Sequence, residues 1–173
     1  MVVPPNNATG LLGQPAGAIS CGPPEIADGV ECWRIARDSE VLDVNSRYAY
    51  LLWCRDFAST SVVARRGGAV VGFVTGYRRP DRPSTLLVWQ VAVDGHARGA
   101  GVAGRMLDAL HAQVSGIEHV ETTITPANTA SIALFTAFAR RHGAAVTRTE
   151  LFGRDVLGAE HDPEILFRIG PIN

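Results

Sequence analysis

The sequence lacks long apolar runs, basic runs and a secretory signal. No stretch approaches the roughly 20 apolar residues that cross a bilayer, and residues 1–16 have neither the basic start nor the apolar core of a signal peptide. The 16 basic and 17 acidic residues give a formal net charge of -1. This balance does not favour nucleic acid or an anionic membrane as the main partner. We therefore expect a cytoplasmic protein that binds neither nucleic acid nor membrane.

Metal-binding patterns are also missing. Cys21, Cys32 and Cys54 are odd in number and widely spaced, so we expect reduced, buried thiols. The histidines His96, His111, His119 and His142 show no ligand spacing. The sequence therefore predicts no metal site.

The length and composition suit one compact domain. The chain has 173 residues, 46% of them hydrophobic and 19% charged, which is enough to bury a sizeable core. Residues 1–16 are rich in Pro, Gly and Asn and predict a flexible N-terminal tail. We expect residues 17–173 to form a single domain.

Apolar periodicity and turn residues predict alternating strands and helices. We expect strands at residues 18–21, 61–65, 69–77, 85–93, 120–124, 145–151 and 164–169. Helices are expected at 25–37, 46–57 and 128–142, with another that follows a glycine-rich turn and ends near residue 114. The strand at 85–93 is apolar on both faces, as a central strand should be.

Two helices have predicted apolar stripes. The expected buried residues of the first helix are Ile26, Val30, Trp33 and Ile35. Those of the second are Tyr48, Leu51 and Leu52, with Asn45 or Ser46 as the helix cap.

The most informative motif is the glycine-rich turn between the central strand and the next helix, which reads Arg98-Gly99-Ala100-Gly101-Val102-Ala103-Gly104. The first backbone N–H groups of a helix lack carbonyl partners, and the helix dipole adds partial positive charge. A phosphate can bind there, and small residues let it approach the amides.

This turn has three interpretations. Gly99, Gly101 and Gly104 match the dinucleotide pattern G-x-G-x-x-G, which is weak evidence on its own. A dinucleotide fold places this pattern after its first strand, whereas about half of this chain precedes it. Arg98, Gly101 and Ala103 match the R-x-x-G-x-A pyrophosphate loop of the GNAT-type N-acetyltransferases. We favour that loop, and a purely structural turn is the remaining alternative.

Five separated segments extend this resemblance. Together they closely resemble the diaminobutyrate acetyltransferases of the ectoine pathway, over about residues 19–171; the segments are residues 37–39, 42–52, 72–77, 88–94 and 164–170. The resemblance implies an α/β protein with the GNAT fold, a mixed and mostly antiparallel central sheet with helices on both faces. It also implies acetyl transfer from acetyl-CoA to the γ-amino group of diaminobutyrate, by a homodimer. Another amine acceptor, or a silent acyl-CoA-binding module, are the alternatives.

The same resemblance assigns site residues. Acetyl-CoA is expected on the amides of the turn, at Arg98, Gly99, Ala100, Gly101, Ala103 and Gly104. Its pantetheine arm is expected to pair like an added strand with Val91, Ala92 and Val93, with Asn128 close by. The diamine is expected against Asp43, Tyr48, Trp89, His161 and Glu164.

The reaction needs a neutral amine, so a base must remove the ammonium proton. We expect Glu164, with Asp43, to do this directly or through water, and His161 is the other candidate. A strand amide near Val91 is expected to stabilise the oxyanion. Many GNAT relatives supply a tyrosine near the thiolate, but this chain has Phe135 at the matching position. Tyr48, Asn128 or water would then assist the leaving group.

Overall fold

The computed structural model describes residues 17–40 and 42–172, so the predicted tail at residues 1–16 lies outside the described residues. The strands are β1 (Ile19–Gly22), β2 (Val62–Arg66), β3 (Ala69–Arg79), β4 (Arg82–Val93), β5 (His119–Ile124), β6 (Val146–Phe152) and β7 (Glu164–Ile169). The helices are α1 (Asp28–Asp38), α2 (Arg47–Asp56), α3 (Val102–Gln113), α4 (Thr129–Arg141) and the short α5 (Arg154–Leu157). None of the described helices is long and apolar enough to cross a bilayer.

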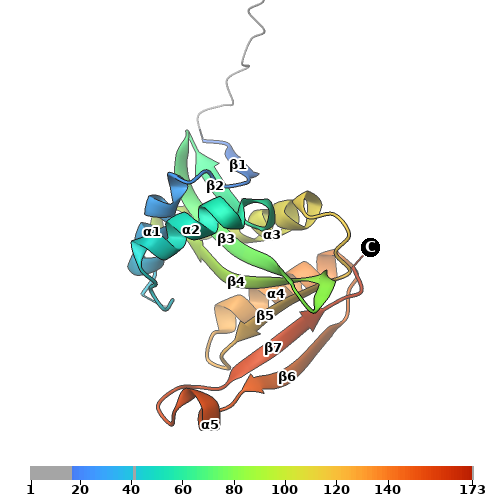
Figure 1. The fold of residues 1–173 in the computed structure, drawn as a ribbon. Coiled ribbons are helices and arrows are strands. Elements are labelled where there is room, and N and C mark those ends of the chain that lie inside the picture. The colour runs from blue at the N-terminus through green and yellow to red at the C-terminus, as the bar shows by residue number, and fades with distance from the viewer. Residues whose placement is uncertain (1–16, 41, 173) are drawn as a thin grey trace, which may run out of the picture.

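All seven strands form one sheet in the order β1-β2-β3-β4-β5-β7-β6 (Figure 1). Every neighbouring pair is antiparallel except β4 and β5, which are parallel. Gly67 and Gly68 form the β2–β3 turn with φ of 57° and 87°, as their position between two strands predicts. The mixed, mostly antiparallel sheet is therefore confirmed.

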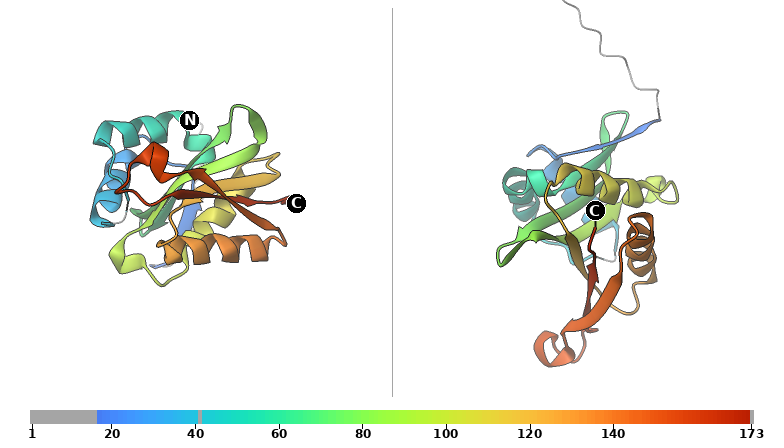
Figure 2. Two further views of the ribbon diagram at one scale, coloured as in Figure 1. Left: turned by 90° about the horizontal axis from the view of Figure 1, so that it is seen from below. Right: turned by 90° about the vertical axis from the view of Figure 1, so that its right-hand side faces the viewer.

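Helices cover both faces of the sheet (Figure 2). Alternate residues of β2 enter different cores: Val62 and Ala64 pack with α3 and α4, whereas Val63 packs with α1 and α2. This separation follows from the two-residue period of a strand. The predicted covering of both faces is confirmed.

The central feature of the sheet is the parting of β4 and β5. The two strands pair only through Thr85 with His119, Leu86 with Val120 and Leu87 with Glu121. Beyond these three pairs, both strands continue without further pairing to each other, β4 to Val93 and β5 to Ile124. An opening therefore lies at the carboxyl ends of two central strands.

The predicted buried stripe of the first helix was wrong at Ile26 and Val30 and right at Ile35, and Trp33 is partly buried against the core. Ile26 and Val30 are exposed, while Asp28, Gly29, Cys32, Ile35 and Ala36 are buried. A Cβ on Gly29 would lie 2.8 Å from the Leu51 main chain, so α1 and α2 cross at this glycine. Asp28 is buried because its carboxylate binds the Arg65 guanidinium at 2.6 Å and 2.9 Å.

The predicted stripe of α2 was wrong at Tyr48, and Leu51 and Leu52 are only half-buried. Tyr48 is 68% exposed, and the helix buries Tyr50 and Cys54. Ser46 is the N-cap, since its hydroxyl accepts a hydrogen bond from the Ala49 N–H at 3.2 Å. The short helix α5, between β6 and β7, was not predicted.

Candidate active site

The glycine-rich turn runs from the end of β4 into α3. Gly99 and Gly101 have φ of 76° and 69°, and a Cβ built on either residue would meet no atom within 4 Å. Gly101 is the N-cap of α3, so the amides of the first helical turn face an open surface. A negatively charged group can reach these amides, and the residues fit a pyrophosphate.

The free edge of β4 leads from this turn into the opening. The Gln90 N–H donates to the Thr75 hydroxyl at 3.2 Å and the Asp94 N–H to the Val71 carbonyl at 2.9 Å, both on the β3 side. Because amides alternate along a strand, those of Val91 and Val93 point to the opposite edge, toward the parted β5. Ala92, expected beside them, turns its main chain to β3.

Arg98 lies where this edge meets the glycine-rich turn. Its Nε donates a hydrogen bond to the Val93 carbonyl at 3.2 Å, which holds the guanidinium group beside the last residue of the free edge. Arg98 also lines a cavity of about 540 Å³ with Thr125 and Asn128. The Arg98 guanidinium therefore lies next to both the open amides of the glycine-rich turn and the free edge of β4.

A second cavity, of about 570 Å³, shares Thr125 and Asn128 with the first. Asp43, Trp89, His161 and Glu164 all line it, although they come from the α1–α2 loop, β4, the α5–β7 loop and β7. The fold therefore brings four of the five predicted acceptor residues together. The fifth, Tyr48, is not among the lining residues.

The second cavity is acidic. Its lining contains the carboxylates of Asp43, Asp162 and Glu164, with His161 as its titratable basic group. Asp162 is paired with Arg154 at 2.8 Å, whereas Asp43 and Glu164 form no salt bridge with another residue of the described part of the chain. Such a cavity attracts a cationic amine.

Asn128 is a helix cap that also faces both cavities. Its Oδ1 accepts from the Ser131 N–H at 3.0 Å at the start of α4. The capping alternative for Asn128 is therefore confirmed, and its location leaves room for a second role. Phe135, about two helical turns further along, is buried in the core, so its ring does not replace the missing phenol in the cavity.

Two of the three cysteines are buried as expected. Cys32 and Cys54 are buried, Cys21 is partly buried, and all three thiols are free. Burial raises the pKa of the Cys21 thiol. Among residues 17–40 and 42–172, no cluster of three or more His, Cys, Asp or Glu could hold a metal ion.

Sequence reasoning missed a charged cluster where β4 and β5 part. The Glu121 side chain is fully buried and accepts from Arg79 at 2.9 Å and from Arg168 at 2.6 Å. Burial alone would raise the pKa of Glu121, but the hydrogen bonds from the two guanidinium groups lower it overall. The cluster joins β3, β5 and β7 at this point, and no local motif in the sequence indicates it.

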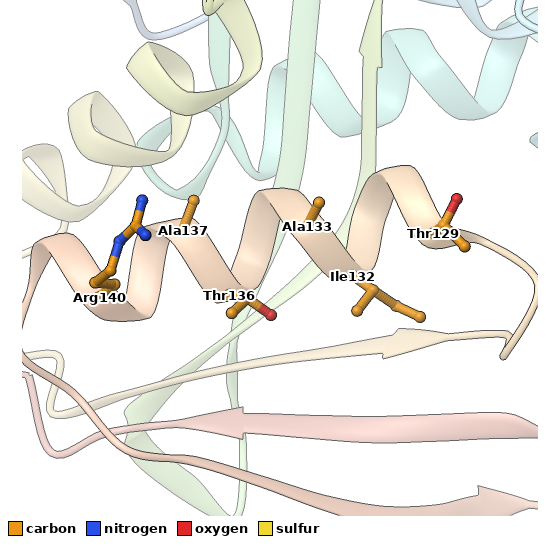
Figure 3. A pocket seen from close by; sticks show the side chains of 6 residues that line it. All are labelled: Thr129, Ile132, Ala133, Thr136, Ala137 and Arg140. Carbon is orange, nitrogen blue, oxygen red and sulfur yellow. The ribbon is translucent and has the colours of Figure 1, made fainter.

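A separate hollow of about 310 Å³ lies along α4 (Figure 3). Its lining residues all belong to this helix: Thr129, Ile132, Ala133, Thr136, Ala137 and Arg140. Figure 3 shows Ala133 and Ala137 on one side of the helix and Ile132 and Thr136 on the other. The hollow shares Thr129 with the 540 Å³ cavity and no residue with the 570 Å³ cavity.

The fold, with its opening between two parted strands, is that of the GNAT-type N-acetyltransferases. In agreement with this class, the profile of the Acetyltransferase (GNAT) family matches residues 27–139.

Closer relatives refine the class. The chain is 58% identical to the L-2,4-diaminobutyric acid acetyltransferase of Streptomyces avermitilis over 155 residues, which cover 87% of each protein. It is 59% identical to the protein of the same name from Streptomyces coelicolor, over 87% of this chain and 91% of the relative.

A solved structure agrees. Diaminobutyrate acetyltransferase EctA from Paenibacillus lautus, in complex with its substrate L-2,4-diaminobutyric acid and coenzyme A, is 37% identical, with a TM-score of 0.85. The match covers 90% of this chain and 96% of that one. The chain therefore belongs to the GNAT family and, within it, to the L-2,4-diaminobutyric acid acetyltransferases. It is an acetyl-CoA-dependent N-acetyltransferase.

Proposed function

We propose that the protein transfers the acetyl group of acetyl-CoA to the γ-amino group of L-2,4-diaminobutyrate, giving N4-acetyl-diaminobutyrate for ectoine synthesis. The observation that carries this proposal is an acidic cavity at the parted strands, in a chain that belongs to this family. Both substrates bind together, and the amine attacks the thioester directly. The products are the amide and the free thiol of coenzyme A.

Acetyl-CoA, the acetyl donor, supplies the reactive thioester. The amides of the glycine-rich turn would hold its pyrophosphate, with the Arg98 guanidinium at the rim. The free amides of Val91 and Val93 would pair with the amide-bearing arm. The Val91 N–H is also the proposed donor to the acetyl oxygen as that oxygen gains negative charge.

The acceptor would lie in the 570 Å³ cavity. Asp43 and Glu164 would bind its ammonium groups, Trp89 would form an apolar wall, and His161 would contact the polar end of the substrate. We also propose that Tyr48 takes part in substrate binding and proton transfer. Its exposure means that this role would require the α2 surface to be covered in the working enzyme.

Glu164 is the proposed general base. It lies at the first residue of β7, where the strand anchors its main chain while its side chain lines the cavity. Its carboxylate would accept the proton of the γ-ammonium, directly or through water, with Asp43 sharing the charge. Tyr48 or water would protonate the leaving thiolate, or Asn128 would donate a hydrogen bond to it.

Thiol release from acetyl-CoA with a panel of amines tests the proposal. We expect selective turnover of L-2,4-diaminobutyrate over ornithine, lysine and monoamines, with acetylation at the γ-nitrogen by mass spectrometry. Turnover of other amines alone would move the assignment to a different acceptor. Coenzyme binding without turnover of any amine would indicate a silent binding module.

A matched pair of variants tests the base. Glu164→Gln should lower kcat by about 10²- to 10⁴-fold and remove the corresponding limb of the pH profile. Glu160→Gln removes a charge from the loop just before β7, outside the lining of the cavity, and should behave like wild type. Full turnover of Glu164→Gln across the pH range would rule out this role.

We also propose that the protein is a cytoplasmic homodimer. Exposed apolar side chains on and beside α1 and α2, including Ile26, Val30 and Tyr48, support a subunit contact there. The free cysteines support a reducing compartment. Light scattering during gel filtration and cell fractionation would test the two statements separately.

A further inference from the structure

The loop between α1 and α2 carries Asp43 to the rim of the acceptor cavity without belonging to a helix or strand. Its backbone includes Glu40 at φ 57°, a left-handed conformation that is uncommon outside glycine. A loop of this kind needs tertiary anchors if it is to hold a carboxylate in one place.

Gln90, on β4, supplies one anchor. Its side-chain Nε2 donates to the Asp43 carbonyl at 3.1 Å, and the residue is only 6% exposed. The bond joins the loop to the central strand of the sheet, beside the point where the β3–β4 register shifts between Thr75 and Gly76.

Tyr50 fixes the other end of the same amide. Its hydroxyl donates to Gln90 Oε1 at 2.9 Å, and the phenol is 2% exposed and packs edge to face on Phe73. Burial raises the pKa of Tyr50, so its hydroxyl keeps its proton. Because the Asp43 carbonyl only accepts, the amide has one favourable orientation.

We propose that Gln90 is a positioning residue for the acceptor: it holds the Asp43 loop at the cavity through the Asp43 carbonyl, while Tyr50 holds its amide oxygen. This inference rests on the proposed function only in assigning Asp43 to the diamine. The anchoring itself is a property of the fold.

Two substitutions remove the anchor; because Gln90 also lines the acceptor cavity, the order of the Asp43 loop has to be measured beside the KM. Gln90→Met keeps the length of the side chain and removes both hydrogen bonds. Gln90→Glu keeps an oxygen for Tyr50 and removes the donor to Asp43. Both variants should raise the KM for diaminobutyrate about tenfold, since each loses the part-buried hydrogen bond to the Asp43 carbonyl. The KM for acetyl-CoA should change less than about twofold.

Leu86→Val is the matched control. Leu86 is buried in the same strand, packs in the core on the opposite face, and does not line the acceptor cavity. We expect this variant to lose thermal stability and to keep both KM values. If Gln90→Met instead raised both KM values in parallel with its fall in Tm, the role of Gln90 would be structural and the proposal would be overturned.

Backbone ¹⁵N relaxation tests the anchor without turnover. Order parameters of residues 42–46 should fall from those of rigid backbone, about 0.85, toward about 0.6 in both Gln90 variants, and stay unchanged in Leu86→Val. An unchanged loop in the Gln90 variants would overturn the anchoring. A wild-type protein that fails to acetylate diaminobutyrate would overturn the proposed function, while the relaxation data would still decide the anchor.

Discussion

The indole rings of Trp53 and Trp89 stack with their centroids 4.5 Å apart and their planes at 30°. Trp89 lines the acceptor cavity from β4, and Trp53 comes from α2. The Trp53 Nε1 donates to the Ser61 hydroxyl at 3.1 Å, which fixes the second ring. The wall of the cavity is therefore two rings thick, and its outer ring belongs to a helix that does not itself line the cavity.

Trp53→Ala should consequently affect acceptor binding. We expect a loss of about 2–4 kcal/mol in the free energy of unfolding, because a large ring is removed from a partly buried stack. The KM for diaminobutyrate should rise several-fold because Trp89 loses its support. Trp53→Phe keeps an aromatic partner and should recover most of both properties. Urea denaturation and steady-state kinetics measure the two effects, and an unchanged KM in Trp53→Ala would refute the link.

Gly101→Ala should weaken coenzyme binding. Its φ of 69° is costly for a residue with a Cβ, by about 1–2 kcal/mol, so the turn is expected to shift its amides. Titration calorimetry with coenzyme A should show at least a fivefold loss of affinity. Gly95→Ala, also open around its Cβ but without a positive φ, is the control that should bind normally. Equal affinity of the two variants would contradict a phosphate-binding turn.

Asn128 separates capping from chemistry. Asn128→Ala should lower the free energy of unfolding by about 1 kcal/mol, because the N-cap of α4 is lost. Asn128→Ser restores a cap but lacks the amide group. If Asn128 also assists the leaving thiolate, Asn128→Ser should recover thermal stability while kcat stays low. Recovery of both would limit Asn128 to capping.

Glu121 should make stability sensitive to acid. The pKa of Glu121 is lowered in the folded protein. The ionised carboxylate therefore adds to the free energy of unfolding above its unfolded-state pKa of about 4.3, and this stabilisation is lost as the pH falls through its pKa in the folded protein. Glu121→Gln should lower the free energy of unfolding by about 2–4 kcal/mol at pH 7 and flatten its fall below about pH 4. Glu118→Gln, exposed just before the same strand, should follow the wild-type pH curve. Denaturant titrations from pH 3 to pH 7 would show this difference.

The sequence predicts the order and approximate bounds of the main elements, because strands and helices alternate with clear turn residues. The sequence does not predict which helix residues are buried when they are buried by something other than apolar side-chain contacts. Gly29 is buried by the close crossing of two helices, and Asp28 by its ion pair with Arg65. A search for apolar stripes cannot find either cause, since both partners are distant in the chain.

The candidate site also has one part that the sequence predicts and another that only the fold explains. The glycine-rich turn is a local motif whose chemistry can be inferred from its own residues. Asp43, Trp89, His161 and Glu164 were expected through resemblance to a family, and only the fold explains why they meet. Gln90 carries no chemical motif, and its importance becomes visible only through the two side-chain contacts that it makes.

The short β4–β5 pairing leaves the sheet with an unfinished ladder. A molecule whose amides pair with that edge completes the ladder. Such a molecule binds the folded chain and not the unfolded chain, so it should protect the protein from heat and proteases as its concentration rises above its Kd. The abundance of the enzyme in a cell would then follow its supply of acyl carrier. Short extended peptidomimetics that occupy the same edge are a rational starting point for inhibitors.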